Sequence, residues 1–252
     1  MHFDWPYFWS QLFLPSDAFI TGLWLTVTMA VSGQVIGMIL GLGIAQARMS
    51  KHRLPRYLAS AYIWAIRGTP LLVQIVFIYT GLAAANIIRF EDITVGGFTF
   101  AGNVQAAILA LGLNEAAYTA EVFRAGIGAV DRGQFEAAKS LGMPPLTMMR
   151  HVVLPQALRV ILLPIGNQFN IMLKNTTLVS VIGVSEMLLV TETINSATFR
   201  TFELYAVLGI YFLILTSIWT LFMGWAERRL TIGRQVTAIR RPAEPLVEGL
   251  SS

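Results

Sequence analysis

The chain has 252 residues, of which 55% are hydrophobic and 13% are charged, with 18 Lys and Arg against 14 Asp and Glu. A soluble domain of this composition would expose large apolar patches, so we expect a polytopic membrane protein. There is no cysteine, which excludes disulfides and thiolate metal sites. The three histidines are scattered and show no metal-ligand spacing, so no metal site is predicted.

Residues 1–18 precede the first long apolar stretch and are rich in aromatic side chains. They lack the basic start and the small-residue cleavage site of a secretory signal. Aromatic residues are enriched where a membrane meets water. We therefore predict an N-terminal interfacial segment over 1–18, outside the bilayer core.

Five stretches are long enough to cross a bilayer, which takes about 20 apolar residues in a helix. They cover 19–47, 57–85, 104–125, 157–182 and 203–226. The expected fold class is an all-α integral membrane protein with a transmembrane domain over 19–230. Residues 231–252 are polar, carry two prolines and are predicted to form a disordered cytoplasmic tail.

The basic residues predict the orientation, because cytoplasmic loops accumulate Lys and Arg. Four of them follow the first span, four follow the third and five follow the fifth, against two in the opposite loops. The N-terminus is therefore predicted outside. The C-terminus and the loop 132–156 are predicted in the cytoplasm.

The first span carries Gly33, Gly37 and Gly41 at a spacing of four. A stripe of small residues lets another helix approach closely. We expect packing between helices of this chain, with a contact to another subunit as the alternative.

The second span contains the string Arg67-Gly68-Thr69-Pro70-Leu71-Leu72-Val73-Gln74. Pro70 removes a backbone donor and restrains the residue before it, so the helix is expected to break near 68–70. The carbonyls freed by the break need partners. Arg67 is expected to snorkel to the cytoplasmic interface rather than to contact a ligand.

The third span holds two acids, which should face a cavity or a partner because a carboxylate in lipid is costly. Glu121 is predicted to pair with Arg124, three residues on and on the same face. Glu115 has no base on its own face. It is either a ligand for an amino or basic group of a substrate or the partner of Lys174 in a salt bridge between helices.

The fourth span is unusually polar and is predicted to lie inside the helix bundle or along a pathway. Its polar residues include Asn167, Gln168, Asn170, Lys174 and Asn175. The stretch 184–199 is too short and too polar to cross. Its residues 186–190 are expected to form a short helix in the outer leaflet or over the cavity.

The loop between the third and fourth spans contains Glu136-Ala137-Ala138, Gly142 after three more residues, and Val152-Val153-Leu154-Pro155 after nine more. This pattern resembles the EAA loop of bacterial ABC importer permeases, from which it departs only in Val152 for Ile. In that family the loop forms a short helix that docks into a groove on a cytoplasmic ATPase. The resemblance implies that 136–149 moves as a rigid helical lever. It also implies an ATPase-coupling site made of Gln134, Glu136, Ala137, Ala138, Gly142, Met143, Leu154 and Pro155.

Two further strings, 67–74 and 117–127, resemble the subgroup of these permeases that carries polar amino acids of the histidine, glutamine and arginine type. The run 173–180 is also similar, with Asn175 where relatives often have Asp, which weakens any inference of a cationic substrate. The resemblance implies a type I ABC importer permease fold. Its substrate route would pass Thr69, Leu72, Glu115, Tyr118, Gln168 and Asn175.

No Gly-Lys-Ser or Gly-Lys-Thr phosphate loop occurs, so the chain is expected not to be an enzyme and to hold no cofactor, while a separate ATPase binds ATP and Mg²⁺. The resemblance implies an identical or paralogous permease subunit, a cytoplasmic ATPase dimer and an extracytoplasmic amino-acid-binding protein as partners, with no role for nucleic acid. Its place would be the bacterial cytoplasmic (inner) membrane. The alternative is a homo-oligomeric channel or an ion-coupled small-solute carrier. A channel needs no such loop, and five spans without evident inverted repeats are few for a carrier.

Overall fold

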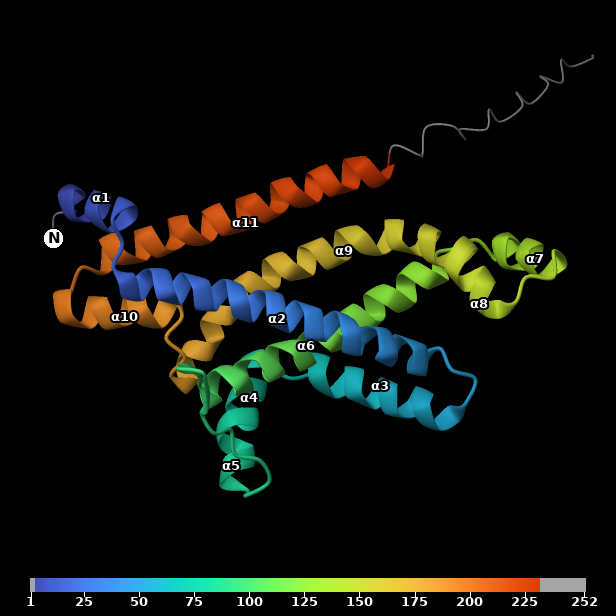
Figure 1. The fold of residues 1–252 in the computed structure, drawn as a ribbon, viewed down its shortest axis with the longest axis horizontal. Coiled ribbons are helices and arrows are strands. Elements are labelled where there is room, and N and C mark those ends of the chain that lie inside the picture. The colour runs from blue at the N-terminus through green and yellow to red at the C-terminus, as the bar shows by residue number, and fades with distance from the viewer. Residues whose placement is uncertain (1–2, 232–252) are drawn as a thin grey trace, which may run out of the picture.

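The computed structural model describes residues 3–231 as a set of helices with one small β-hairpin (Figure 1). Most of the predicted tail, 232–252, lies outside the described residues. The helices and strands are α1 (Trp5–Phe13), α2 (Asp17–Arg48), α3 (Arg53–Arg67), α4 (Leu71–Val76), α5 (Leu82–Ala84), β1 (Ile93–Val95), β2 (Phe98–Phe100), α6 (Gly102–Gly128), α7 (Arg132–Ser140), α8 (Pro145–Met148), α9 (Leu154–Asn175), α10 (Met187–Thr198) and α11 (Thr201–Thr231). Two π-helical turns, Phe77–Gly81 and Met149–Val153, and a 3-10 turn, Thr176–Ile182, join neighbouring helices.

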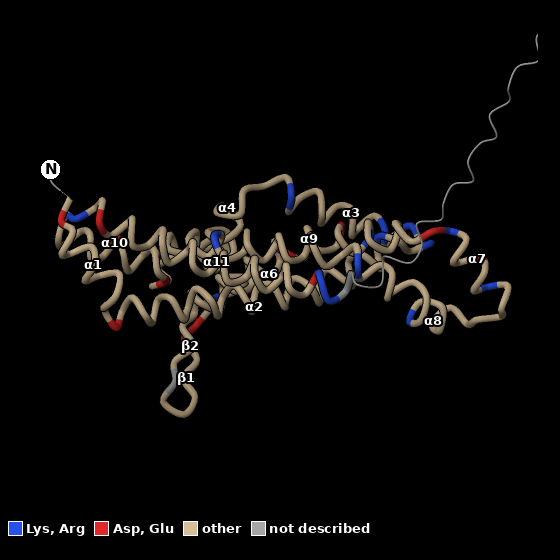
Figure 2. Tube along the Cα trace, turned by 90° about the horizontal axis from the view of Figure 1, so that it is seen from above, with Lys and Arg blue, Asp and Glu red and all other residues tan. Residues whose placement is uncertain are grey.

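The long helices α2, α6, α9 and α11 run along the length of the molecule (Figure 1). The helices α1 and α10 lie at one end, and α7, α8 and the turn between α2 and α3 lie at the other. Figure 2 shows most Lys and Arg positions toward the end that carries α7 and α8. The structure thus gathers at one end the loops that the basic residues predict to be cytoplasmic.

Three helical stretches within 3–231 are long and apolar enough to cross a membrane: Asp17–Arg48, Pro145–Ile182 and Thr201–Arg229. The helices of the predicted second span make a fourth only if they count as one span, because the chain bends by 106° between Arg53–Arg67 and Leu71–Ala84. The predicted third span, α6, is not among them, since its acids and amides lower its hydropathy. The chain is a multi-pass helical membrane protein, but the predicted number of five spans is not confirmed.

The helix α6 lies at the centre of the fold and packs most extensively on α2. A Cβ atom added at Gly37 would lie 2.5 Å from Cγ of Glu115, and one at Gly41 would lie 2.9 Å from Cβ of Thr119. Real carbon contacts are about 3.5–4.0 Å, so these glycines allow α6 to lie closer to α2 than larger residues would. The predicted packing of the glycine stripe within this chain is confirmed.

The break predicted in the second span is confirmed at Gly68–Pro70. The amide of Gln74 donates to the carbonyl of Ile66 at 2.8 Å and to the carbonyl of Thr69 at 3.1 Å. It also meets the Thr69 hydroxyl at 2.9 Å. Gln74 therefore satisfies carbonyls that the break frees, and its own oxygen accepts from Asn114 of α6 at 2.9 Å. This bond fixes the broken helix to the central one.

The hairpin of β1 and β2 was not expected from the sequence. Its strands pair antiparallel from Ile93 with Phe100 to Val95 with Phe98. They are joined by Gly96 and Gly97, whose φ angles of 58° and 84° suit a tight turn. A Gly-Gly pair between β-branched and aromatic residues is the signal that could have predicted it.

The predicted interfacial segment contains α1, whose Trp5, Trp9 and Phe13 are exposed. Asp4 caps this helix, since the Tyr7 N–H donates to its carboxylate at 3.0 Å. Arg200 pairs with Asp4 and stacks over the Tyr7 ring, which ties α1 to the start of α11. The first long helix begins at Asp17, slightly earlier than the predicted span.

The short helix expected over 186–190 is present but longer, as α10. Glu186 caps it by accepting the N–H groups of Leu188 and Leu189 at 2.9 and 3.0 Å. Its side chain is fully buried, and this burial raises the pKa of the Glu186 carboxyl to about 7 despite the two N–H groups. Gly22 of α2 lies against the backbone at this cap, where an added Cβ atom would be 3.1 Å from the Glu186 carbonyl carbon, a tighter contact than usual.

Candidate transport groove and coupling loop

A groove of about 510 Å³ opens between α6, α9 and the end of α3. Its wall includes Arg67, Tyr118 and Gln168, with Asn167 and Glu121 beside them. The Arg67 guanidinium lies over the Tyr118 ring, 5.2 Å from its centre. The groove thus combines cationic, acidic, aromatic and amide groups, which is suited to a small polar solute.

Two of the six residues predicted for the substrate route, Tyr118 and Gln168, line this groove. The other four do not. The Thr69 hydroxyl is engaged with Gln74, Leu72 projects from α4 with 40% of its side chain exposed, and Asn175 is half-buried at the far end of α9.

Glu115 is 5% exposed and lies in the interface of α2 and α6. Its carboxylate accepts from the Gln34 amide at 3.2 Å and from the Thr119 hydroxyl at 2.8 Å. The predicted salt bridge to Lys174 is wrong, since Lys174 is exposed and forms no ion pair within the described residues. Gln34 was missed because only bases were considered as partners for a buried acid, although an amide also donates.

Arg67 is exposed, lines the groove and contacts Tyr118, while its predicted place at the cytoplasmic interface stays a prediction. The cation–π contact gives the guanidinium a partner at this position. The predicted pair of Glu121 with Arg124 is confirmed at 2.8 Å. Arg48, the last residue of α2, makes a second contact to Glu121 at 2.9 Å, so this acid links the C-terminal parts of α2 and α6.

The predicted coupling loop, residues 132–156, contains two short helices, α7 and α8, joined by a turn. Asp131 caps α7 by accepting the Gly133 N–H at 2.7 Å. Just after this helix, Gly142 adopts a φ of 69°. The Gly142 N–H donates to the carbonyl of Lys139, and the Met143 N–H donates to the carbonyl of Ala138 at 3.1 Å. These two bonds form a Schellman motif, which needs the left-handed conformation that glycine adopts easily.

The predicted lever over 136–149 is therefore not a single helix. Its first part ends with α7 at Ser140, and Pro145 starts α8 after the turn. A hydrophobic group, called the loop cluster here, holds both parts against α6 and α9. It consists of Val130, Ala138, Met148, Val153, Ala157 and Ile161.

The residues predicted for ATPase coupling divide into two groups in this structure. Ala138 and Met143 belong to the loop cluster or pack against it, and Leu154 is half-buried at the start of α9. Gln134 accepts from the Gln156 amide at 3.3 Å. The exposed ones are Gln134, Glu136, Ala137, Gly142 and Pro155.

Sequence reasoning missed Leu141 and Leu146, each of which is 81% exposed beside the turn. Apolar residues that flank a glycine in a polar loop were the available signal. Two such side chains at the end of a membrane protein indicate a contact surface for another protein.

A helical membrane protein that carries a polar groove and presents this loop at one end is a transport permease. The chain belongs to the family described as "Binding-protein-dependent transport system inner membrane component", which matches residues 16–232. The expected family resemblance is therefore confirmed, and it favours an importer permease over a channel or an ion-coupled carrier.

Relatives support the same placement. The chain is 34% identical over 232 residues to the glutamine transport system permease protein GlnP of Escherichia coli, covering 92% of this chain and all of GlnP. It is 31% identical over 222 residues to the histidine/lysine/arginine/ornithine transport system permease protein HisM of Salmonella typhimurium, covering 88% and 94%. A solved structure described as an amino acid ABC transporter with histidines matches with a TM-score of 0.78 and 38% identity, covering 91% of this chain and 100% of that one.

Proposed function

We propose that this chain is the permease subunit of an ATP-driven, binding-protein-dependent amino acid importer in the bacterial cytoplasmic membrane. It contributes half of the translocation pathway and pairs with an identical or paralogous permease. A separate cytoplasmic ATPase dimer binds ATP and Mg²⁺, and an extracytoplasmic protein delivers the amino acid. The relatives named for amino acid transport support the substrate class.

The observation that carries the proposal is the coupling loop, which has its own apolar core and an exposed apolar tip. Leu141 and Leu146 supply apolar contacts at this tip, and the exposed Glu136 lies on the same short helix–turn–helix. Since the loop lies at the end where the basic residues gather, a cytoplasmic partner can reach it (Figure 2).

The loop cluster gives this contact a mechanical consequence. Val153, Ala157 and Ile161 of this cluster belong to the start of α9 and the turn before it, so a force on α7 is passed directly to α9. Gln168 lies about 20 Å along this helix from its start at Leu154, at 1.5 Å per residue. Movement of the loop is therefore expected to shift one wall of the groove relative to Arg67 and Tyr118.

The shape of the groove supports pairing with a second permease. Its wall comes from α3, α6 and α9 alone, and α4 with the π-helical turn after it projects away from the long helices and carries the exposed apolar residues Val73 and Phe77 (Figure 1). A second subunit would cover such residues and close the pathway. Within this pathway, Arg67 is suited to the substrate carboxylate, whereas Glu121 is already paired with Arg48 and Arg124.

The test is co-purification of the ATPase and uptake of labelled amino acids after reconstitution with the cognate ATPase and binding protein. Leu141→Asp with Leu146→Asp should abolish both ATPase retention and uptake while the protein still inserts. The matched control is Ile87→Asp, which also replaces an exposed apolar residue outside the spans. Full ATPase retention and uptake by the double variant would overturn the coupling assignment.

A further inference from the structure

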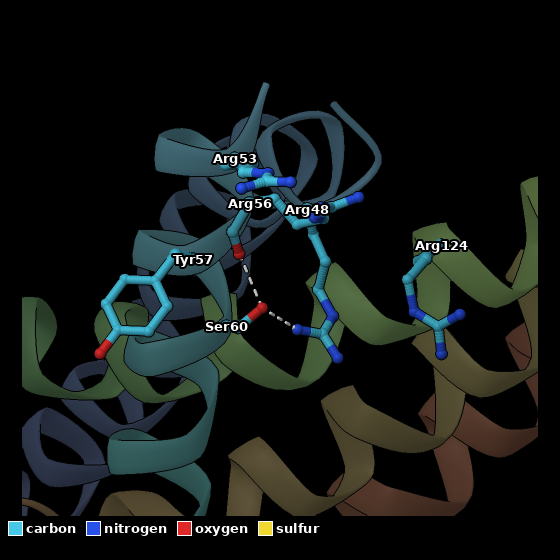
Figure 3. A pocket seen from close by; sticks show the side chains of 6 residues that line it. All are labelled: Arg48, Arg53, Arg56, Tyr57, Ser60 and Arg124. Atoms are coloured by element: carbon cyan, nitrogen blue, oxygen red, sulfur yellow. Dashed lines mark hydrogen bonds between the residues drawn. The ribbon is translucent and has the colours of Figure 1, made fainter. Parts of the chain in front are cut away.

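A second cavity, of about 670 Å³, shares Arg124 with the groove and is lined mainly by arginine side chains. Its lining residues are Arg48, Arg53, Arg56, Tyr57, Ser60 and Arg124 (Figure 3). No carboxylate lines it. The volume falls within the roughly 300–1,000 Å³ typical of small-molecule sites.

The charges of this cavity are only partly balanced. Glu121 pairs with Arg48 and Arg124. In the part of the chain that the structure describes, neither Arg53 nor Arg56 has a carboxylate within ion-pair distance. Like charges placed together repel each other unless an anion joins them, so the cavity is suited to a negatively charged group.

The cavity also has fixed internal structure. The Ser60 hydroxyl donates to the carbonyl of Arg56 at 2.7 Å and accepts a hydrogen bond from the Arg48 guanidinium (Figure 3). Arg48 is thereby held between α2 and α3 while its side chain also reaches Glu121. One wall is therefore positioned before any anion binds, which lowers the entropy cost of binding.

The neighbouring face of α3 is apolar and exposed. Leu54, Tyr57, Leu58 and Trp64 are 69%, 71%, 58% and 79% exposed, and their spacing places them on one side of the helix. Arg53, Arg56 and Ser60 form the adjacent side at spacings of three and four. Tyr57 belongs to both features, since it lines the cavity and lies within the apolar stripe.

We propose that this cavity binds the phosphate headgroup of an anionic phospholipid, whose acyl chains lie along the apolar stripe of α3. A cluster of arginines beside an apolar helical face is the arrangement that recognises such lipids. A free phosphate would use the arginines alone and leave the stripe without a role. An acidic surface of an ATPase would be expected on α7 and α8, whereas the cavity is lined by residues of α2, α3 and α6 beside the turn between α2 and α3.

The predicted orientation would place this lipid in the cytoplasmic leaflet, but lipid binding itself requires neither that orientation nor ATPase coupling. The two proposals can therefore fail separately. Loss of ATPase retention in the loop variants leaves lipid binding intact, and loss of lipid binding in cavity variants leaves the loop assignment intact.

The test is native mass spectrometry of the full chain with phosphatidylglycerol or phosphatidylcholine of the same acyl chains. Wild-type protein should retain phosphatidylglycerol preferentially, and excess inorganic phosphate should not displace it. Each basic residue near an anionic surface strengthens binding by about fivefold, so Arg53→Gln with Arg56→Gln should weaken it about 30-fold. Arg53→Lys with Arg56→Lys keeps both charges and should retain most of the affinity.

The matched control is Arg228→Gln with Arg229→Gln, which removes two exposed arginines from the end of α11. It should change the affinity less than twofold. Three outcomes would overturn the proposal. The wild type could retain phosphatidylcholine as well as phosphatidylglycerol, the control could lose as much affinity as the Gln variant, or the Lys variant could lose as much affinity as the Gln variant. Displacement by phosphate would identify a site for soluble anions instead, and lipid binding that the ATPase abolishes would identify an ATPase contact. If the Gln double variant does not fold, each single variant should weaken binding about fivefold.

Discussion

Replacing Gly37 by alanine tests the contact that holds the central helix α6 against α2. The new methyl carbon would lie 2.5 and 2.6 Å from the Cγ and Cβ atoms of Glu115. Ordinary carbon contacts need about 3.5 Å, so the helices must separate by about 1 Å. These atoms are close to the α6 backbone and cannot swing away. Overpacking of this kind costs about 1–3 kcal/mol.

The matched control is Gly43→Ala on the same helix, where an added Cβ meets nothing within 4 Å. Alanine there should leave stability unchanged or raise it by up to about 1 kcal/mol through helix propensity. At about 2–4 °C per kcal/mol for a chain of this size, Gly37→Ala should melt about 2–16 °C below Gly43→Ala. Thermal unfolding in detergent, followed by tryptophan fluorescence, measures this difference. A Gly37 variant that melts at or above the control would refute the packing argument.

Three further predictions concern the ends of the molecule. Burial raises the pKa of the Glu186 carboxyl from 4.5 to about 7, so the folded protein binds a proton here more tightly than the unfolded chain does. This difference stabilises the fold fully below about pH 4.5, and the stabilisation is lost as the pH rises through 7. The melting temperature of the wild type should therefore fall as the pH rises from about 4.5 to 7, and Glu186→Gln should remove this fall. A variant with the same pH profile as the wild type would contradict this role of Glu186. Arg200→Ala should speed amide exchange across α1, whereas Arg89→Ala, at an exposed position in another loop, should not. In Gly142→Ala the alanine must adopt a left-handed φ at a cost of about 1–2 kcal/mol, which should speed proteolysis in the loop. Gly128→Ala, where an added Cβ meets nothing within 4 Å, should not speed it. Equal cleavage of both variants would argue against the Schellman turn.

The sequence predicted the features that depend on local rules. Pro70 in an apolar run predicted the break, the glycine spacing predicted a close helix contact, and Glu121 with Arg124 followed from helical geometry. The motif around Glu136 predicted the family without any structure. In each case the cause lies within a few residues of the observed feature.

The features that were missed depend on contacts distant in sequence. The partner of Glu115 is Gln34, 81 residues away, and the partner of Gln74 is Asn114, 40 residues away. Nothing near either residue specifies these pairs. The coupling loop was predicted as one helix because the motif carries no information on the φ angle of Gly142. The assignment of ATPase and substrate roles to single residues stays a prediction that needs the assembled transporter.

The central position of α6 has a consequence for biosynthesis. A helix with Asn114, Glu115 and Glu121 in its length partitions poorly into lipid when it leaves the insertion machinery alone. Its polar partners Gln34 and Arg48 belong to α2, which is synthesised earlier, so a receptive surface already exists when α6 emerges. The order of helices along the chain therefore also provides an order of assembly, in which the apolar α2 enters first and supplies partners to the polar α6 that follows.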